Sequence, residues 1–109
     1  MGLDNFWYQN DAPEGTPPMG LSFDPPLNLC GGMFSAHGEG SFRGKVYADL
    51  IHEVSEIDIY GDLSNEQVKQ IADALEFQLT LANPNLDIHD LARMFRAYAD
   101  AGAVLVAWY

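Results

Sequence analysis

The sequence predicts an α+β fold in which three helices pack on a small, mainly antiparallel sheet of about four strands. Three observations lead to this prediction. Two amphipathic helical segments follow one another between residues 64 and 102, each with start and stop signals. Short alternating or aromatic segments lie on either side of them, and an uncharged apolar segment ends the sequence. The predicted order is strand, loop, strand, helix, strand, helix, helix, strand.

The first strand is predicted within residues 1–9, where Phe6, Trp7 and Tyr8 are consecutive, because neighbouring side chains of a strand point to opposite faces. Residues 10–26, rich in Pro and Gly, are predicted to form a loop. The period-2 pattern over 27–30 predicts a short strand. Glycines are interleaved with apolar residues over 31–40, which indicates a structural or functional loop rather than a linker.

The first helix is predicted over residues 43–55, with Ser41 as its N-cap. Five apolar residues recur on one face at helical spacing: Val46, Tyr47, Leu50, Ile51 and Val54. Residues 57–60 then alternate and predict a strand that Gly61 and Asp62 close.

The second helix has the clearest start signal, because Ser64 and Gln67 form a capping box. Asn-Pro-Asn at residues 83–85 ends it. The third helix is predicted to start at Asp87, with Asp90 in its first turn and Gly102 as its C-cap.

The last strand is predicted over residues 103–109, with Val104, Val106 and Trp108 on one face. Its other face is also apolar. A strand of this kind is expected to be central and covered on both sides, or covered on one side by a second subunit.

The length of 109 residues suits a single domain over 1–109. Sixteen acidic and five basic residues give a net charge of -11, so direct nucleic-acid binding is not expected. Solubility or a salty, marine habitat explains such a charge. The alternative is a surface that mimics nucleic acid and occupies a basic partner. The acids are spread along the chain, which favours the first explanation.

Cys30 is the single cysteine, so no intrachain disulfide can form, as is typical of a reducing compartment. We expect the cytoplasm, or the host cytoplasm for a viral protein. No apolar run approaches the ~20 residues of a membrane helix, and residues 1–10 lack the pattern of a signal peptide. No membrane association is expected.

The segment 38–45 is the candidate ligand site, through Gly40, Ser41, Arg43 and Lys45. It precedes a predicted helix, and backbone N–H groups at a helix N-terminus attract anions. Arg43 and Lys45 add positive charge that a phosphate or carboxylate would use. The segment lacks the spacing of a P-loop and of the dinucleotide-binding fingerprint. The alternative is a tight turn whose cations pair with nearby acids.

Arg93 and Arg96 are a second close pair of cations, three residues apart on the third helix. Ion pairs with Asp90 and Asp100 explain them. If the third helix packs near the glycine loop, all four cations converge on one anion.

No metal site or cofactor is expected. His52 with Asp49 and Glu56 supplies at most half of a metal site, and no two histidines have ligand spacing. Pairs of acids are expected by chance among sixteen, and no serine lies in a nucleophile elbow. The sequence thus holds no catalytic signature, and whether the protein is an enzyme stays open.

Large aromatic residues lie at both ends of the sequence and predict either neighbouring strands of one sheet or an exposed patch for a partner or second copy. Two function hypotheses follow. The first is a non-catalytic interaction protein, viral or marine microbial, acting through its acidic surface or aromatic patch, with a homodimer through the last strand as one form. The second is a small-molecule binder that holds an anion at the glycine loop. A small hydrolase or lyase using that loop is a weaker third.

Overall fold

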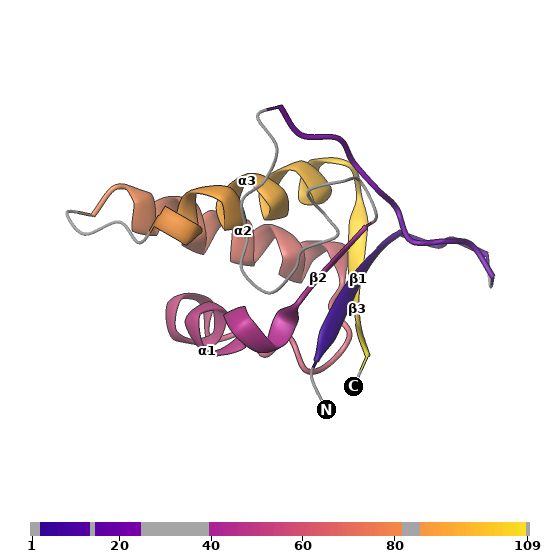
Figure 1. Ribbon diagram of the computed structural model, residues 1–109, viewed down its shortest axis with the longest axis horizontal. Helices are drawn as coiled ribbons and strands as arrows, with labels where there is room; N and C mark the ends of the chain where they lie inside the picture. Colours follow the sequence, from indigo (N-terminus) through magenta and orange to yellow (C-terminus); the bar gives the residue numbers. More distant parts are fainter. Residues whose placement is uncertain (1–2, 14, 25–39, 82–85, 109) are drawn as a thin grey trace.

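The computed structural model describes residues 3–13, 15–24, 40–81 and 86–108. In this part of the chain the fold is α+β, as predicted. Helices α1 (Gly44–Ser55), α2 (Asn65–Leu79) and α3 (Leu86–Asp100) pack on an antiparallel sheet of β1 (Asp4–Gln9), β2 (Ser41–Phe42) and β3 (Ala103–Trp108). Figure 1 shows the three helices on one side of the sheet. The predicted strand over 27–30 and the glycines over 31–39 lie outside the described residues.

The sheet has the strand order β2-β1-β3, so the two ends of the sequence pair with each other. The register runs from Asp4 opposite Trp108 to Gln9 opposite Ala103. This confirms the prediction that the terminal aromatic segments are neighbouring strands. It also corrects the expectation that the last strand is central. Among the described strands the central one is β1, because it alone pairs on both sides.

The prediction of a strand over residues 57–60 is wrong. Glu56 ends α1 in a left-handed conformation, with φ of 61°. Two of the following backbone amides donate to side-chain oxygens. Ile57 N donates to Ser55 Oγ at 3.1 Å, and Tyr60 N donates to Asp58 Oδ1 at 2.8 Å. Such local bonds favour turns over ladder pairing. The alternation therefore marks which side chains are buried, not a strand.

Ser41 is not the N-cap of α1. It lies in β2, opposite Phe6 of β1, and Arg43 is the N-cap. The buried ring of Phe42 packs 5.8 Å from Trp7, which holds this segment in the sheet, so the helix begins only at Gly44. The buried face of α1 is also rotated from the predicted one. Val46 is 45% exposed.

The predictions for α2 and α3 are confirmed more closely. The hydroxyl of Ser64 accepts from Gln67 N, and Gln67 Oε1 accepts from Ser64 N at 3.0 Å, which completes the capping box. Helix α3 starts at Leu86, one residue before the predicted start. Gly102 follows α3 with φ of 81°, a conformation that glycine adopts without strain.

Aromatic rings form the centre of the core between the sheet and α3. Trp7 stacks on Tyr98 with centroids 4.4 Å apart and planes 4° from parallel, and Phe95 meets Trp7 edge-on at 5.1 Å. The Tyr98 hydroxyl accepts a hydrogen bond from Leu21 N at 3.0 Å, and burial raises the pKa of Tyr98. This bond attaches the segment before residue 25 to α3.

In the described part of the chain, none of the helices has both the length and the apolar character that crossing a bilayer requires.

Candidate functional site

The side of the sheet away from the helices is an apolar surface, which we call the outer face. It consists of Phe6 and Tyr8 of β1 and Val104, Val106 and Trp108 of β3. The register places Phe6 opposite Val106 and Tyr8 opposite Val104, and the Phe6 and Trp108 rings meet edge-on at 6.1 Å. Trp108 is 59% exposed. The predicted common face of Val104, Val106 and Trp108 is confirmed.

Residues 10–13 and 15–18, which we call the arm, project from the sheet beside the outer face (Figure 1). The arm is held at its base, because Asn10 N donates to Gly102 O and Met19 N donates to Trp7 O at 2.6 Å. Within it, both the amide and the hydroxyl of Thr16 donate to Pro13 O. The arm and the outer face enclose a hollow of about 480 Å³. The residues lining it are Tyr8, Gln9, Asp11, Ala12, Pro13, Gly15, Thr16, Val104, Val106 and Trp108.

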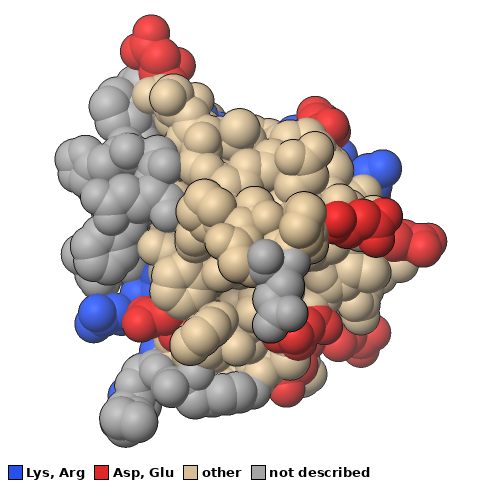
Figure 2. All heavy atoms as spheres, turned by 90° about the vertical axis from the view of Figure 1, so that its right-hand side faces the viewer, with Lys and Arg blue, Asp and Glu red and all other residues tan. Residues whose placement is uncertain are grey.

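Figure 2 views the molecule from the side on which the arm lies in Figure 1. The centre of this view is mostly uncharged, and acidic side chains gather along its right-hand and lower margins. Three acids adjoin the outer face. Asp4 lies opposite Trp108 in the register, Asp11 lines the hollow, and Asp62 accepts a hydrogen bond from Ala107 N at 3.0 Å. The outer face therefore has an apolar centre and an acidic margin.

The edge of β3 that faces away from β1 is covered by the residues that precede α2 and by the first residue of α2. Leu105 exchanges both backbone bonds with Leu63, at 2.8 and 3.2 Å. The side chain of Asn65 donates to Ala103 O at 2.9 Å, and the carboxylate of Asp62 accepts a hydrogen bond from Ala107 N. These hydrogen bonds occupy backbone N–H and C=O groups of β3 that an added strand would need for pairing.

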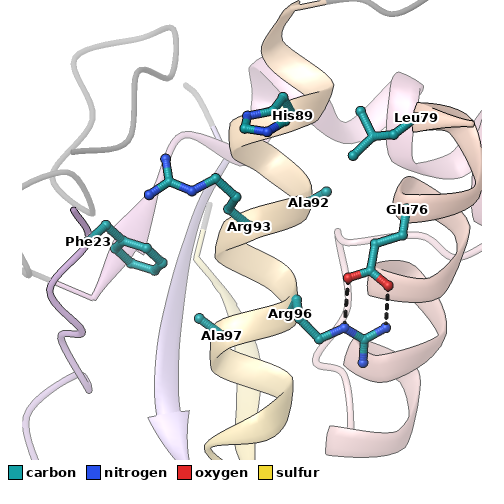
Figure 3. A pocket seen from close by; sticks show the side chains of 8 residues that line it. All are labelled: Phe23, Glu76, Leu79, His89, Ala92, Arg93, Arg96 and Ala97. Carbon is teal, nitrogen blue, oxygen red and sulfur yellow. Dashed lines mark hydrogen bonds and ion pairs between the residues drawn. The ribbon is translucent and has the colours of Figure 1, made fainter. Parts of the chain in front are cut away.

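A second hollow, of about 380 Å³, lies over the outer surface of α3 (Figure 3). Phe23 lies on one side of it, and Glu76 and Leu79 of α2 lie on the other. From α3 it is lined by His89, Ala92, Arg93, Arg96 and Ala97. Arg93 and Arg96, the second cation pair of the predicted ligand site, thus line one hollow. Arg43 and Lys45 are not among its described lining residues.

The two arginines are held by acids. Arg93 pairs with Asp90 at 2.9 Å, as predicted, and its guanidinium carbon lies 5.9 Å from the centre of the Phe23 ring. Arg96 makes two hydrogen bonds to Glu76, at 2.9 and 2.8 Å, drawn as dashed lines in Figure 3. It also bonds Asp73, and its predicted partner Asp100 lies 3.8 Å away.

This cluster shifts the pKa values of its members. The hydrogen bond from Arg96 lowers the pKa of Glu76, and the bonds to Glu76 and Asp73 raise the pKa of Arg96. Each group thus favours the charged form of the other. An added anion would have to compete with these carboxylates for Arg96.

The first predicted cation pair lies where β2 meets α1. Arg43 forms an ion pair with Asp4 at 3.7 Å, and Lys45 is exposed. Two amides at the start of α1 already have backbone acceptors, since Lys45 N donates to Leu3 O at 3.0 Å and Val46 N donates to Arg43 O at 3.2 Å. The anion site at this segment stays a prediction.

Gly40 and Ser41, the other two candidates in this segment, are buried. Gly40 has φ of 73°, and a Cβ there would lie 2.6 Å from Met19 O. This glycine is therefore explained by the close approach of two backbones. Ser41 has 5% of its surface exposed.

In the described part of the chain, no three His, Cys, Asp or Glu side chains are grouped to hold a metal ion. An open hollow is lined by His52, Asp49, Glu53 and Asp58. Glu56, the other predicted neighbour of His52, is the C-cap of α1 and is not among the lining residues.

No protein-family model, curated protein or solved structure matches this chain.

Proposed function

We propose that this chain is a non-catalytic interaction protein that binds a positively charged protein partner through its outer face. The observation that supports this is the continuous apolar surface of β1 and β3, with the indole of Trp108 59% exposed. Exposed aromatic residues in a hollow, with charge at the margin, are the usual anatomy of a protein interface. Burial of Trp108 and its neighbours would supply the affinity.

Charge favours a basic partner over a second copy of this chain. Each copy carries -11, and two copies meeting at the outer face would bring together two acidic margins, in which Asp11 and Asp62 add to the repulsion while Asp4 is paired with Arg43. A basic surface would instead pair with these acids and associate faster through electrostatic steering. The same charge that repels nucleic acid thus selects proteins that carry the opposite sign. We place the interaction in the cytoplasm, or in the host cytoplasm for a viral protein.

The test compares two variants that each remove an exposed aromatic side chain. Trp108→Ala changes the outer face, and Phe77→Ala changes a residue of α2 that is 62% exposed and belongs to neither hollow as described. Immobilised wild-type and variant proteins are incubated with cell extract at low and at physiological salt. We expect a basic protein that wild type and Phe77→Ala retain, that Trp108→Ala loses, and that salt weakens.

Recovery of the same proteins by wild type and Trp108→Ala would contradict the proposal. Sedimentation of the purified chain is the second measurement. A dimer that dissociates in Trp108→Ala but not in Phe77→Ala would show that a second copy, rather than a basic partner, covers the outer face.

A further inference from the structure

The closed edge of β3 restricts how a partner can bind the outer face. The backbone groups of Leu105, the carbonyl of Ala103 and the amide of Ala107 all have partners within the chain. A peptide strand that extended the sheet beyond β3 would have to displace them. Strand addition gains its affinity from such main-chain hydrogen bonds, so the structure disfavours it here. A partner that binds at β3 would therefore contact the outer face through side chains.

The dimensions of the outer face suit a helix. β1 and β3 each have six residues, so the face is about 20 Å long, and a helix of about 14 residues has the same length. The arm rises along one end of the face and makes the hollow concave. A helix packs on a sheet as a further layer, as α2 and α3 do on the opposite side.

The positions of the acids define the polar sides of such a helix. Asp4 lies at the Trp108 end of the face, Asp11 lies at the arm end, and Asp62 lies along the β3 edge. An apolar stripe over Val106 and Trp108 would thus have carboxylates at both ends and along one side. Lysine or arginine residues that flank the stripe would pair with them.

On the premise that the outer face binds a basic protein partner, we propose that this partner presents an amphipathic helix with basic flanks, laid across β1 and β3 against the arm. Its apolar side chains enter the hollow beside Trp108. Its cations face Asp11 and Asp62, and those at the Trp108 end compete with Arg43 for Asp4. Such a helix would bind through its side chains and would leave the backbone hydrogen bonds at the edge of β3 intact, whereas an added strand would have to break them.

The test uses two peptides of leucine and lysine with the same length and composition. The first, Leu-Lys-Lys-Leu-Leu-Lys-Lys-Leu-Leu-Lys-Lys-Leu-Leu-Lys, forms an amphipathic helix, whereas in the second leucine and lysine alternate in the pattern of a strand. Binding to the full chain is measured by isothermal titration calorimetry at physiological salt, and peptide helicity by circular dichroism. We expect the helical peptide to bind at least about tenfold more tightly than the alternating one.

The variants separate this inference from the proposed function. Trp108→Ala should weaken binding of the helical peptide by about tenfold or more, with Phe77→Ala as the control that binds like wild type. If the alternating peptide binds as tightly and Trp108→Ala still weakens it, the outer face is a docking surface but the helix is wrong. If Trp108→Ala changes neither peptide, or both bind equally to all variants, attraction is by charge alone, and both proposals are overturned.

Discussion

Gly44, the first residue of α1, provides a stability test in which the structure predicts the opposite sign from sequence rules. Alanine in place of a helical glycine ordinarily stabilises a protein by about 0.4–1 kcal/mol, since it reduces the freedom of the unfolded chain. At Gly44 the added Cβ would overlap Asn5 Oδ1 and lie 3.0 Å from Leu3 Cδ2. Asn5 is fully buried and donates to Ile59 O at 2.9 Å.

The amide of Asn5 can make room only by breaking that buried bond or by moving β1. Loss of a buried hydrogen bond, or overpacking of a core, costs about 1–3 kcal/mol. We therefore expect Gly44→Ala to lower the free energy of unfolding by about 1–2 kcal/mol. The measurement is urea denaturation followed by circular dichroism.

Two further variants check the cause. Gly61→Ala is the matched control, since a Cβ at Gly61 meets no described atom within 4 Å and should change stability by less than about 0.5 kcal/mol. In an Asn5→Ala background the obstacle is gone, so Gly44→Ala should cost little, giving a coupling of about 1–3 kcal/mol. A Gly44→Ala protein as stable as wild type, or one whose cost is unchanged without Asn5, would refute this reasoning.

Three other predictions concern polar contacts. Arg96→Met should lower stability at neutral pH by about 1 kcal/mol. Because the folded pKa of Glu76 is lowered from 4.5, this difference should be full above pH 4.5 and shrink as the pH falls through the folded pKa; equal differences at acidic and neutral pH in urea titrations would contradict it. Tyr98→Phe removes the acceptor of Leu21 N and should cost about 1 kcal/mol while speeding chymotryptic cleavage near residue 21, and an unchanged cleavage rate would count against that role. Arg43→Ala should abolish any thermal stabilisation by inorganic phosphate, and a wild-type protein that phosphate does not stabilise would remove the anion hypothesis.

Features that depend on nearby residues could be predicted from the sequence. The capping box of Ser64 and Gln67 lies within one helical turn, so its pattern is visible in four letters. The shared face of Val104, Val106 and Trp108 follows from strand alternation alone. For the same reason the alternation over 57–60 was misleading, because it reports burial of Ile59 without showing that a ladder partner exists.

Features that join distant residues had no local signal. The two acids that bond Arg96 from α2 are 20 and 23 positions away, and only the packing of α2 on α3 brings them there. Closure of the β3 edge by Asp62, Leu63 and Asn65 depends likewise on where the segment before α2 is placed. The residues that share the outer side of β3 could therefore be predicted from the sequence. The position of the arm and the covered edge of β3 could not.

The pairing of β1 with β3 has a consequence for how the protein folds. β1 pairs with the two-residue strand β2 on one side, but its six-residue partner β3 comes from the other end of the sequence, with Asp4 opposite Trp108. Local helices form in microseconds, whereas closing so long a loop carries its entropy cost before any contact offsets it. During synthesis Trp7 would emerge from the ribosome long before its ladder partner Leu105 and before Phe95 and Tyr98, the rings of α3 that bury it in the folded protein. The core around Trp7 can therefore close only after α3 has been made.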